Sequence, residues 1–357
     1  MSAPRHNISH PRAIVSLVGA CLLFSLACAQ LTHAQVNAPA QADDKTRGIE
    51  LYQHGDYEGA VRVLQVVVKQ QKNDADAWYY LGLTYNRKND VKQARKAFEH
   101  ALKLRPQFDA AQTGIAYTLL RGHKLAEAER AANRALAMNA QNAEAYYVLG
   151  VVHLQGQKNA DALSASEAAL RVKPDYAPAF LLKSQALVGL FEQENEAAIK
   201  AAELGNSAPP SATTQARSAR LREAAQSIER FLTLSPNHPD APFWREQLET
   251  LRVYTAAPEG PSVYNTKEVT SRAIITSKPE PTFTQEARQN NTQGEIVLRM
   301  VLAADGKVKY ILVLKGLSDG LTERAIAAAR QITFIPAMKD GHPVSQFVTV
   351  SYNFNIY

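Results

Sequence analysis

Cysteine is almost absent from this chain of 357 residues. Its two cysteines, Cys21 and Cys28, both precede the first acidic residue, Asp43. If the segment that holds them is removed as a leader, the remaining chain has no side chain for a disulfide, a thiolate nucleophile or a cysteine metal ligand. We therefore expect the mature protein to be stabilised by packing alone.

The N-terminal segment has the charge pattern of a secretory signal. Arg5 and Arg12 precede an apolar run at 13–29, which contains no acidic residue. These features predict a signal peptide at residues 1–34 and export to the periplasm or cell envelope. An uncleaved anchor that associates with the inner membrane is the alternative, because with Leu31 the run approaches the length of a membrane span. Lipidation of a leader cysteine stays open as a third fate.

The chain also lacks the patterns that carry catalysis or nucleic-acid binding. Its formal net charge is +6, with 40 basic and 34 acidic residues interspersed, and no basic stripe has aromatic residues between its charges. This distribution argues against nucleic acid as a partner. The nine histidines are scattered without metal-ligand spacing, and no glycine-rich phosphate loop is present. We therefore expect no enzymatic activity, no catalytic residues, no cofactor and no metal.

What the sequence does contain is a repeat with a period of 34 residues. Alanine recurs at positions 94, 128 and 162 and again at 101, 135 and 169, and Pro106 and Pro174 lie two periods apart. Apolar residues at three-and-four spacing flank polar turns such as 87–90, so each unit reads as two amphipathic helices. Neither helix buries its apolar stripe alone. Stacked neighbours would complete the core as a solenoid with a concave face.

The repeat resembles a known family. Eight positions of one unit carry the residues typical of it: Trp78, Leu81, Gly82, Tyr85, Ala94, Phe98, Ala101 and Pro106. This pattern resembles the tetratricopeptide repeat (TPR) family, and the resemblance extends over roughly residues 44–251. It implies an all-α solenoid of helix-turn-helix repeats at residues 41–252. In the fifth unit we expect an inserted loop near 205–220, and at 242–251 a closing helix with Glu246 exposed.

Strand signals replace helical ones after a predicted linker at 253–262, which contains two prolines and a glycine. The run GEIVLRMVLAADGKVKYILVLKG predicts two strands joined at Asp305 and Gly306. LTERAIAAARQI predicts a helix, and VSQFVTVSYNF predicts a final strand. We expect a small α+β domain at residues 263–357, with a three-stranded antiparallel sheet and two helices.

This second region also resembles a known domain. The residues that carry the likeness are PEPTFTQEAR, Gln293-Gly294, Asp305-Gly306, Phe334, Pro336-Ala337, Asp340-Gly341 and Val344. They resemble the C-terminal domain of TonB-family proteins. The resemblance implies a periplasmic domain that grips a short segment of an outer-membrane transporter by adding it as a strand beside the last strand. The main-chain groups expected to bind belong to Phe347, Val348, Thr349, Val350, Ser351 and Tyr352.

Helical geometry gives candidate contact residues in the repeat domain. The residues expected on the concave face of the first helices are Tyr79, Asn86, Arg87, Tyr117, Arg121, Tyr147 and Gln155. Tyrosines there would offer apolar area with a hydrogen-bonding tip, and arginines would favour an acidic peptide end. The alternative is that the tyrosines pack between helices and the arginines are solvated.

Taken together, the sequence predicts a non-enzymatic envelope adaptor that binds proteins or peptides on its repeats and docks through a sheet edge. An energy transducer for outer-membrane transport is the alternative. Transducers of the TonB family place a Pro-rich spacer before the C-terminal domain and a Ser and a His four residues apart in the membrane helix. Here Ser16 is followed at that distance by Ala20, and Ser25 by Ala29. An enzyme with an unrecognised site is a third hypothesis.

Overall fold

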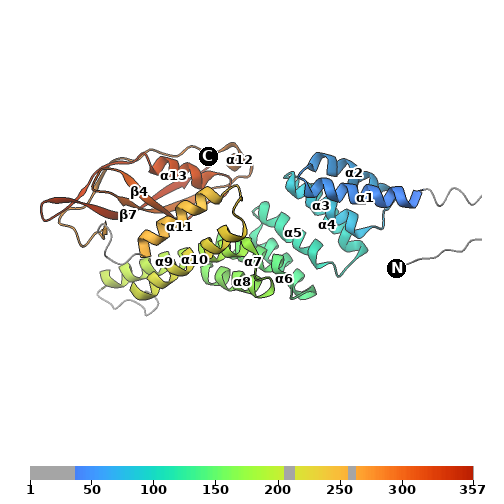
Figure 1. Cartoon of the computed structure of the whole chain (residues 1–357), viewed down its shortest axis with the longest axis horizontal. Coiled ribbons are helices and arrows are strands. Elements are labelled where there is room, and N and C mark those ends of the chain that lie inside the picture. The colour runs from blue at the N-terminus through green and yellow to red at the C-terminus, as the bar shows by residue number, and fades with distance from the viewer. Residues whose placement is uncertain (1–36, 205–213, 256–262, 357) are drawn as a thin grey trace, which may run out of the picture.

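The computed structural model describes residues 37–204, 214–255 and 263–356. In this part of the chain, helices α1 to α11 precede a small domain of strands with two further helices (Figure 1). The predicted signal peptide at 1–34 lies outside the described residues, as does most of the predicted linker. The first helices are α1 (Asn37–Gln53), α2 (Tyr57–Gln70), α3 (Ala75–Arg87), α4 (Val91–Leu104), α5 (Asp109–Arg121), α6 (Leu125–Met138), α7 (Ala143–Gln155) and α8 (Asn159–Val172).

The helix boundaries confirm the repeat. Second helices begin at residues 57, 91, 125 and 159, and first helices begin at 75, 109, 143 and 177, so both series advance by 34 residues. The turns inside the hairpins repeat as well, because Gly55, Asn89, His123 and Gln157 occupy the same position and all have positive φ. Each helix packs on its neighbours in the order of the sequence, as in a solenoid.

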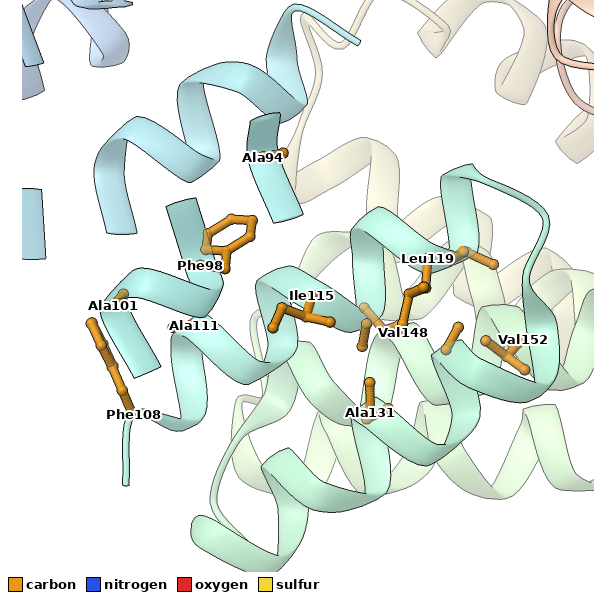
Figure 2. Packing of buried hydrophobic residues seen from close by; sticks show 14 of the residues in the cluster. Ala94, Phe98, Ala101, Phe108, Ala111, Ile115, Leu119, Ala131, Val148 and Val152 are labelled. Atoms are coloured by element: carbon orange, nitrogen blue, oxygen red, sulfur yellow. The ribbon is translucent and has the colours of Figure 1, made fainter. Parts of the chain in front are cut away.

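Small residues allow the helices of neighbouring repeats to approach closely. Phe98 is fully buried between Gly82 of α3 and Gly114 of α5. A Cβ atom at these two glycines would lie 2.7 and 2.6 Å from the Phe98 ring, so a larger residue requires the helices to separate. Figure 2 shows Phe98, Ile115 and Val148 in one continuous core that runs from repeat to repeat.

The fifth repeat differs from the prediction, because helix extends into part of the segment that was expected to be an inserted loop. Helix α9 (Ala177–Glu203) has 27 residues and α10 (Thr214–Leu234) has 21, so residues 214–220 are helical, and the prediction of a loop across 205–220 is wrong for them. The sequence before residue 205 is rich in Ala and Glu, which favour helix, and the extended turns bury Phe191 of α9 and Leu221 of α10. Residues 205–213 lie outside the described residues.

The C-terminal domain has the expected α+β fold. Strands β3 (Gly294–Leu302), β4 (Val308–Lys315) and β7 (His342–Phe354) form an antiparallel sheet in the order β7-β3-β4, and the β3–β4 turn uses Gly306 at φ 79°. Two short strands pair with β7 and bring the sheet to five strands. They are β1 (Val263–Tyr264), which is parallel to β7, and β6 (Ala337–Lys339), which is antiparallel.

A separate two-stranded sheet and two helices complete the domain. The remaining elements are β2 (Ile274–Ser277), β5 (Thr333–Ile335), α12 (Gln285–Gln289) and α13 (Leu321–Ala329). On one face of the main sheet, Leu298, Val350 and Tyr352 share a buried cluster with Leu321 and Ala325 of α13. This cluster is the core of the domain.

The other face of the sheet packs on the end of the solenoid. Leu312 and Leu314 of β4 join a buried cluster with Leu187 of α9 and Leu251 of α11 (Ala241–Thr255). The sheet therefore lies between α13 and the last solenoid helices (Figure 1). The predicted closing helix exists as α11, but one of its sides is covered by the sheet, so it joins the two domains instead of ending the stack in solvent.

Candidate protein-binding surfaces

The predicted tyrosines of the repeat domain divide into two groups. Tyr79 and Tyr147 are half-buried: the Tyr79 ring centroid lies 5.0 Å from that of Phe108, and the Tyr147 centroid lies 5.7 Å from that of Tyr176. Burial raises the pKa of both Tyr79 and Tyr147 to about 12, because the packed surroundings disfavour the charged phenolate. Tyr117, by contrast, is 38% exposed. The packing alternative therefore describes Tyr79 and Tyr147, and Tyr117 presents its ring to solvent.

The polar candidates of the repeat domain also divide into buried and exposed residues. Asn86 is 5% exposed, and its Oδ1 accepts a hydrogen bond from Thr118 Oγ1 at 2.9 Å. The prediction of Asn86 as a groove contact is therefore wrong, because its side chain joins α3 to α5. Arg121 donates from Nη1 to the Asn86 carbonyl oxygen at 2.7 Å. Arg87 and Gln155 occupy the corresponding position of the neighbouring repeats, and both are exposed.

The sheet edge at β7 is open over most of its length. On one side, β3 pairs with β7 from Gln346 to Phe354. On the other side, β1 pairs only with Ser345 and Gln346. Within the described ranges, no strand pairs with that side of β7 beyond Gln346. The open segment is therefore 347–354.

Only alternate residues of this segment offer main-chain groups to a partner. The Ser351 carbonyl oxygen accepts a hydrogen bond from Lys278 Nζ at 3.0 Å, so this oxygen points away from β3. Because backbone groups of alternate residues point to the same side of an antiparallel strand, those of Phe347 and Thr349 point outward too. Among the six predicted edge residues, these three lie as the strand-addition hypothesis requires.

The other three predicted edge residues face inward. Val348, Val350 and Tyr352 direct their main-chain groups toward β3 and their side chains into the core beneath α13. The prediction that their amides and carbonyls are available to a partner is therefore wrong. The alternation of apolar residues at 348, 350, 352 and 354 carried the signal that separates the two sets.

The opposite sheet edge, at β4, is closed by one residue that the sequence analysis missed. Gln247 of α11 is 4% exposed; its Nε2 donates to the Ile311 carbonyl oxygen at 3.0 Å, and its Oε1 accepts from the Val313 amide at 3.3 Å. Its side-chain amide thus takes the place of a neighbouring strand. A polar residue on the apolar stripe of Trp244, Leu248 and Leu251 was the available signal.

Comparison with known proteins agrees with both halves of this architecture. The C-terminal family of the Gram-negative bacterial TonB protein matches residues 279–356, and the TPR domain of cytochrome c-type biogenesis protein H matches residues 60–175. The chain is a TPR protein with a TonB C-terminal domain. No curated protein matches it.

Several solved structures are similar to this chain at low sequence identity. A thermophilic TPR protein of Thermus thermophilus is 16% identical over 60% of this chain and 99% of its own, with a TM-score of 0.45. Pseudomonas aeruginosa PilF is 19% identical over 61% of this chain and 94% of its own, with a TM-score of 0.41. MamA of Desulfovibrio magneticus RS-1 is 18% identical over 56% and 97%, with a TM-score of 0.38.

The TPR solenoid and the TonB domain meet in a mixed aromatic and charged cluster. The Arg299 guanidinium lies 5.1 Å from the ring centroid of Phe347 and 6.0 Å from that of Tyr254 of α11. Burial raises the pKa of Glu192 of α9, although the nearby Arg299 charge opposes that shift. An ion pair between Glu246 and Arg330, with N and O 2.6 Å apart, adds a more exposed contact. These contacts join the two domains at one interface.

The described residues offer neither a metal centre nor a membrane span. In the part of the chain that the structure describes, no three His, Cys, Asp or Glu side chains form a group that could hold a metal ion. Across residues 37–204, 214–255 and 263–356, no helix combines the length and apolar character needed to cross a membrane.

Proposed function

We propose that this chain is a non-enzymatic adaptor of the cell envelope, which holds one partner on the face of its first TPR helices and adds a second partner as a strand on β7. The observation that carries the proposal is the open segment 347–354. Unpaired amides and carbonyls on a sheet edge form a template for an extended segment of another chain. A periplasmic segment of an outer-membrane transporter is the partner that the TonB resemblance suggests.

The joint between the domains supports an adaptor with fixed geometry. Because Gln247 and the Leu312 cluster hold the TonB domain on α11, the β7 edge is carried at a constant position relative to the repeats. The exposed residues Arg87, Tyr117 and Gln155 give the repeat face both charge and aromatic area for a peptide. Two partners would thus be held at a defined separation.

Export to the periplasm rests on the charge pattern of the N-terminal segment. N-terminal sequencing of the protein purified from its own cells tests it, with a mature N-terminus at Gln30 or Gln35 as the expected result. The match of residues 279–356 to the TonB C-terminal family favours an energy transducer as the second candidate. A transducer needs a retained anchor, so an intact N-terminus in the membrane fraction would favour it over the adaptor.

Strand addition is tested by Thr349→Pro with Thr349→Ala as its matched control. Thr349 is exposed and its amide points away from β3, so proline removes an outward donor without breaking the β3 ladder. We expect Thr349→Pro to weaken binding of a synthetic transporter peptide to the full chain by about tenfold or more, which is about 1.4 kcal/mol. Thr349→Ala removes only the side chain and should bind nearly as the wild type does.

Calorimetric titration gives the affinities, and circular dichroism shows that both variants are folded. If folded Thr349→Pro binds the peptide as tightly as Thr349→Ala does, the β7 edge is not the docking site. If the wild type binds no transporter peptide, the proposed partner class is wrong.

A further inference from the structure

The face formed by the second helices of the solenoid carries two neighbouring grooves that the proposed function does not use. The first has a volume of about 480 Å³ and lies between α4 and the α5–α6 turn. Its floor is apolar, with Val91 of α4 and Leu119 of α5. Its walls carry basic side chains: Lys92, Arg95, Lys96 and Lys124.

The second groove lies one repeat nearer the N-terminus and has a volume of about 390 Å³. It is lined by Val68 and Leu81 at its floor and by Lys69, Lys72 and Lys96. Lys96 thus belongs to both grooves, which places them side by side along α4. An elongated ligand could follow both without leaving the surface.

The positive charge of these grooves is poorly balanced by the protein. Glu99 is the one carboxylate among the residues lining the two grooves, and it already pairs with Arg95 at 2.8 Å. Lys124 pairs with Glu127 outside the groove at 3.5 Å. Nearby Asp90 accepts a hydrogen bond from the Gln93 amide as the N-cap of α4.

Four lysines remain without a counter-charge. In the described part of the chain, no salt bridge involves Lys69, Lys72, Lys92 or Lys96, and all four are exposed. We call these four residues and the two groove floors between them the basic face. Its charge and its apolar floor complement a segment that alternates carboxylates with apolar side chains.

We propose that the basic face is a third protein-binding site, which takes an acidic protein segment with apolar residues between its carboxylates. Apolar side chains of the segment enter the two grooves, against the half-buried Val91 and the aliphatic stems of the lysines, and its carboxylates meet the lysine ammonium groups at the rims. A concave floor favours an inserted polypeptide over a membrane surface. Trp78 at the second groove stacks on His100 with ring centroids 4.4 Å apart, so its ring face is already occupied on one side. This arrangement disfavours nucleic-acid bases, which need free aromatic platforms.

The test uses the full chain and a fluorescent synthetic peptide in which Glu alternates with Leu, with binding followed by anisotropy. Lys92→Glu/Lys96→Glu reverses the charge of the basic face, and Lys103→Glu/Lys158→Glu makes the same charge change at exposed residues outside both grooves. We expect the first variant to weaken binding by about tenfold or more and the control to change it by less than about twofold. Lys92→Arg/Lys96→Arg should bind as the wild type does.

Several outcomes overturn the proposal. Equal weakening by both charge-reversal variants would assign binding to net charge alone, and absence of binding to the wild type would remove the site. Vesicles with anionic lipids, or single-stranded DNA, that bind through Lys92 and Lys96 while the peptide does not would assign the face to another ligand class. Lys92→Ala/Lys96→Ala provides a second test if the reversed variant is unfolded by circular dichroism. Thr349→Pro should leave peptide binding unchanged, which separates this site from the β7 edge.

Discussion

The two edges of the TonB sheet offer the same backbone chemistry in different surroundings. At β4, the side chain of Gln247 pairs with Ile311 and Val313, and α11 covers the edge. At β7, the outer side of the open segment 347–354 is not paired with a strand in the described residues. There, Lys278 Nζ donates a hydrogen bond to the Ser351 carbonyl oxygen. The last solenoid helix therefore determines which edge stays open. In the proposed function, the repeats would therefore serve as a binding array and would also direct strand addition to one side of the sheet.

A bulge in β4 also disfavours the addition of a strand at this edge. The β3–β4 register shifts between Arg299 and Val301, where Tyr310 adopts a φ of 50°. The bulge lies beside the contact with α11, because the Tyr254 hydroxyl donates to the Tyr310 carbonyl at 3.4 Å. Bulges at an edge disrupt regular pairing and discourage addition of a further strand. The closed edge is thus protected twice, whereas β7 keeps a regular ladder.

The largest expected effect comes from opening the closed edge with Gln247→Leu. This change leaves the Ile311 carbonyl and the Val313 amide without a partner beneath α11. Because each of these two unsatisfied groups costs about 1–3 kcal/mol, the free energy of unfolding should fall by about 2–6 kcal/mol, measured by urea denaturation. Glu249→Leu, at an exposed position of the same helix, should change it by less than about 0.5 kcal/mol. Equal stability of the two variants would mean that Gln247 does not close the edge.

This comparison also shows what the sequence could and could not predict. The repeats were predictable because each hairpin carries its own amphipathic pattern, and the helix boundaries follow the same 34-residue period. Gln247 was missed because its partner Ile311 lies 64 residues away, in another domain. Likewise, Asn86 reads as a surface residue until the next repeat places Thr118 against it.

Very short strands, and a helix end that precedes a glycine and two prolines, were the other source of error. Strands β1 and β6 have two and three residues, which is too short to show alternation, and they exist because β7 offers them pairing partners. The end of α9 was hidden because the sequence pattern beyond it breaks at Gly205 and two prolines. Local patterns therefore specified the elements, and contacts distant in sequence specified which surfaces remain free.

A smaller effect is expected from pH, at the cluster where the sheet meets the solenoid. Burial raises the pKa of Glu192, with the Arg299 charge opposing the shift and Glu196 adding to it. The native state thus holds the Glu192 proton more tightly than the unfolded chain does. Its contribution to stability is complete below the ordinary glutamate value of 4.5 and is lost as pH rises through the raised native pKa.

The measurement is the free energy of unfolding of the wild type minus that of Glu192→Gln across a pH series. The difference should increase as the pH is lowered from neutral toward 4.5, because only the wild type gains the proton. A flat difference would mean that Glu192 titrates alike in both states and is not buried by docking of the TonB domain. Glu144→Gln, at an exposed position of α7 that does not contribute to the Glu192 shift, provides the control.

The smallest expected effect is at the open edge, where Lys278 competes with an incoming strand for the Ser351 carbonyl. Lys278 Nζ also lies 4.8 Å from the Tyr352 ring centroid, so the side chain rests along the edge. Because an exposed hydrogen bond of this kind is worth about 0.5–1 kcal/mol, Lys278→Ala should tighten binding of a partner strand about threefold in calorimetric titration. Weaker binding would instead show that Lys278 contacts the partner. In that case Lys278 helps to bind the partner strand at β7. The two side chains would then have opposite roles, because Gln247 closes the edge at β4 and Lys278 recruits a strand to the edge at β7.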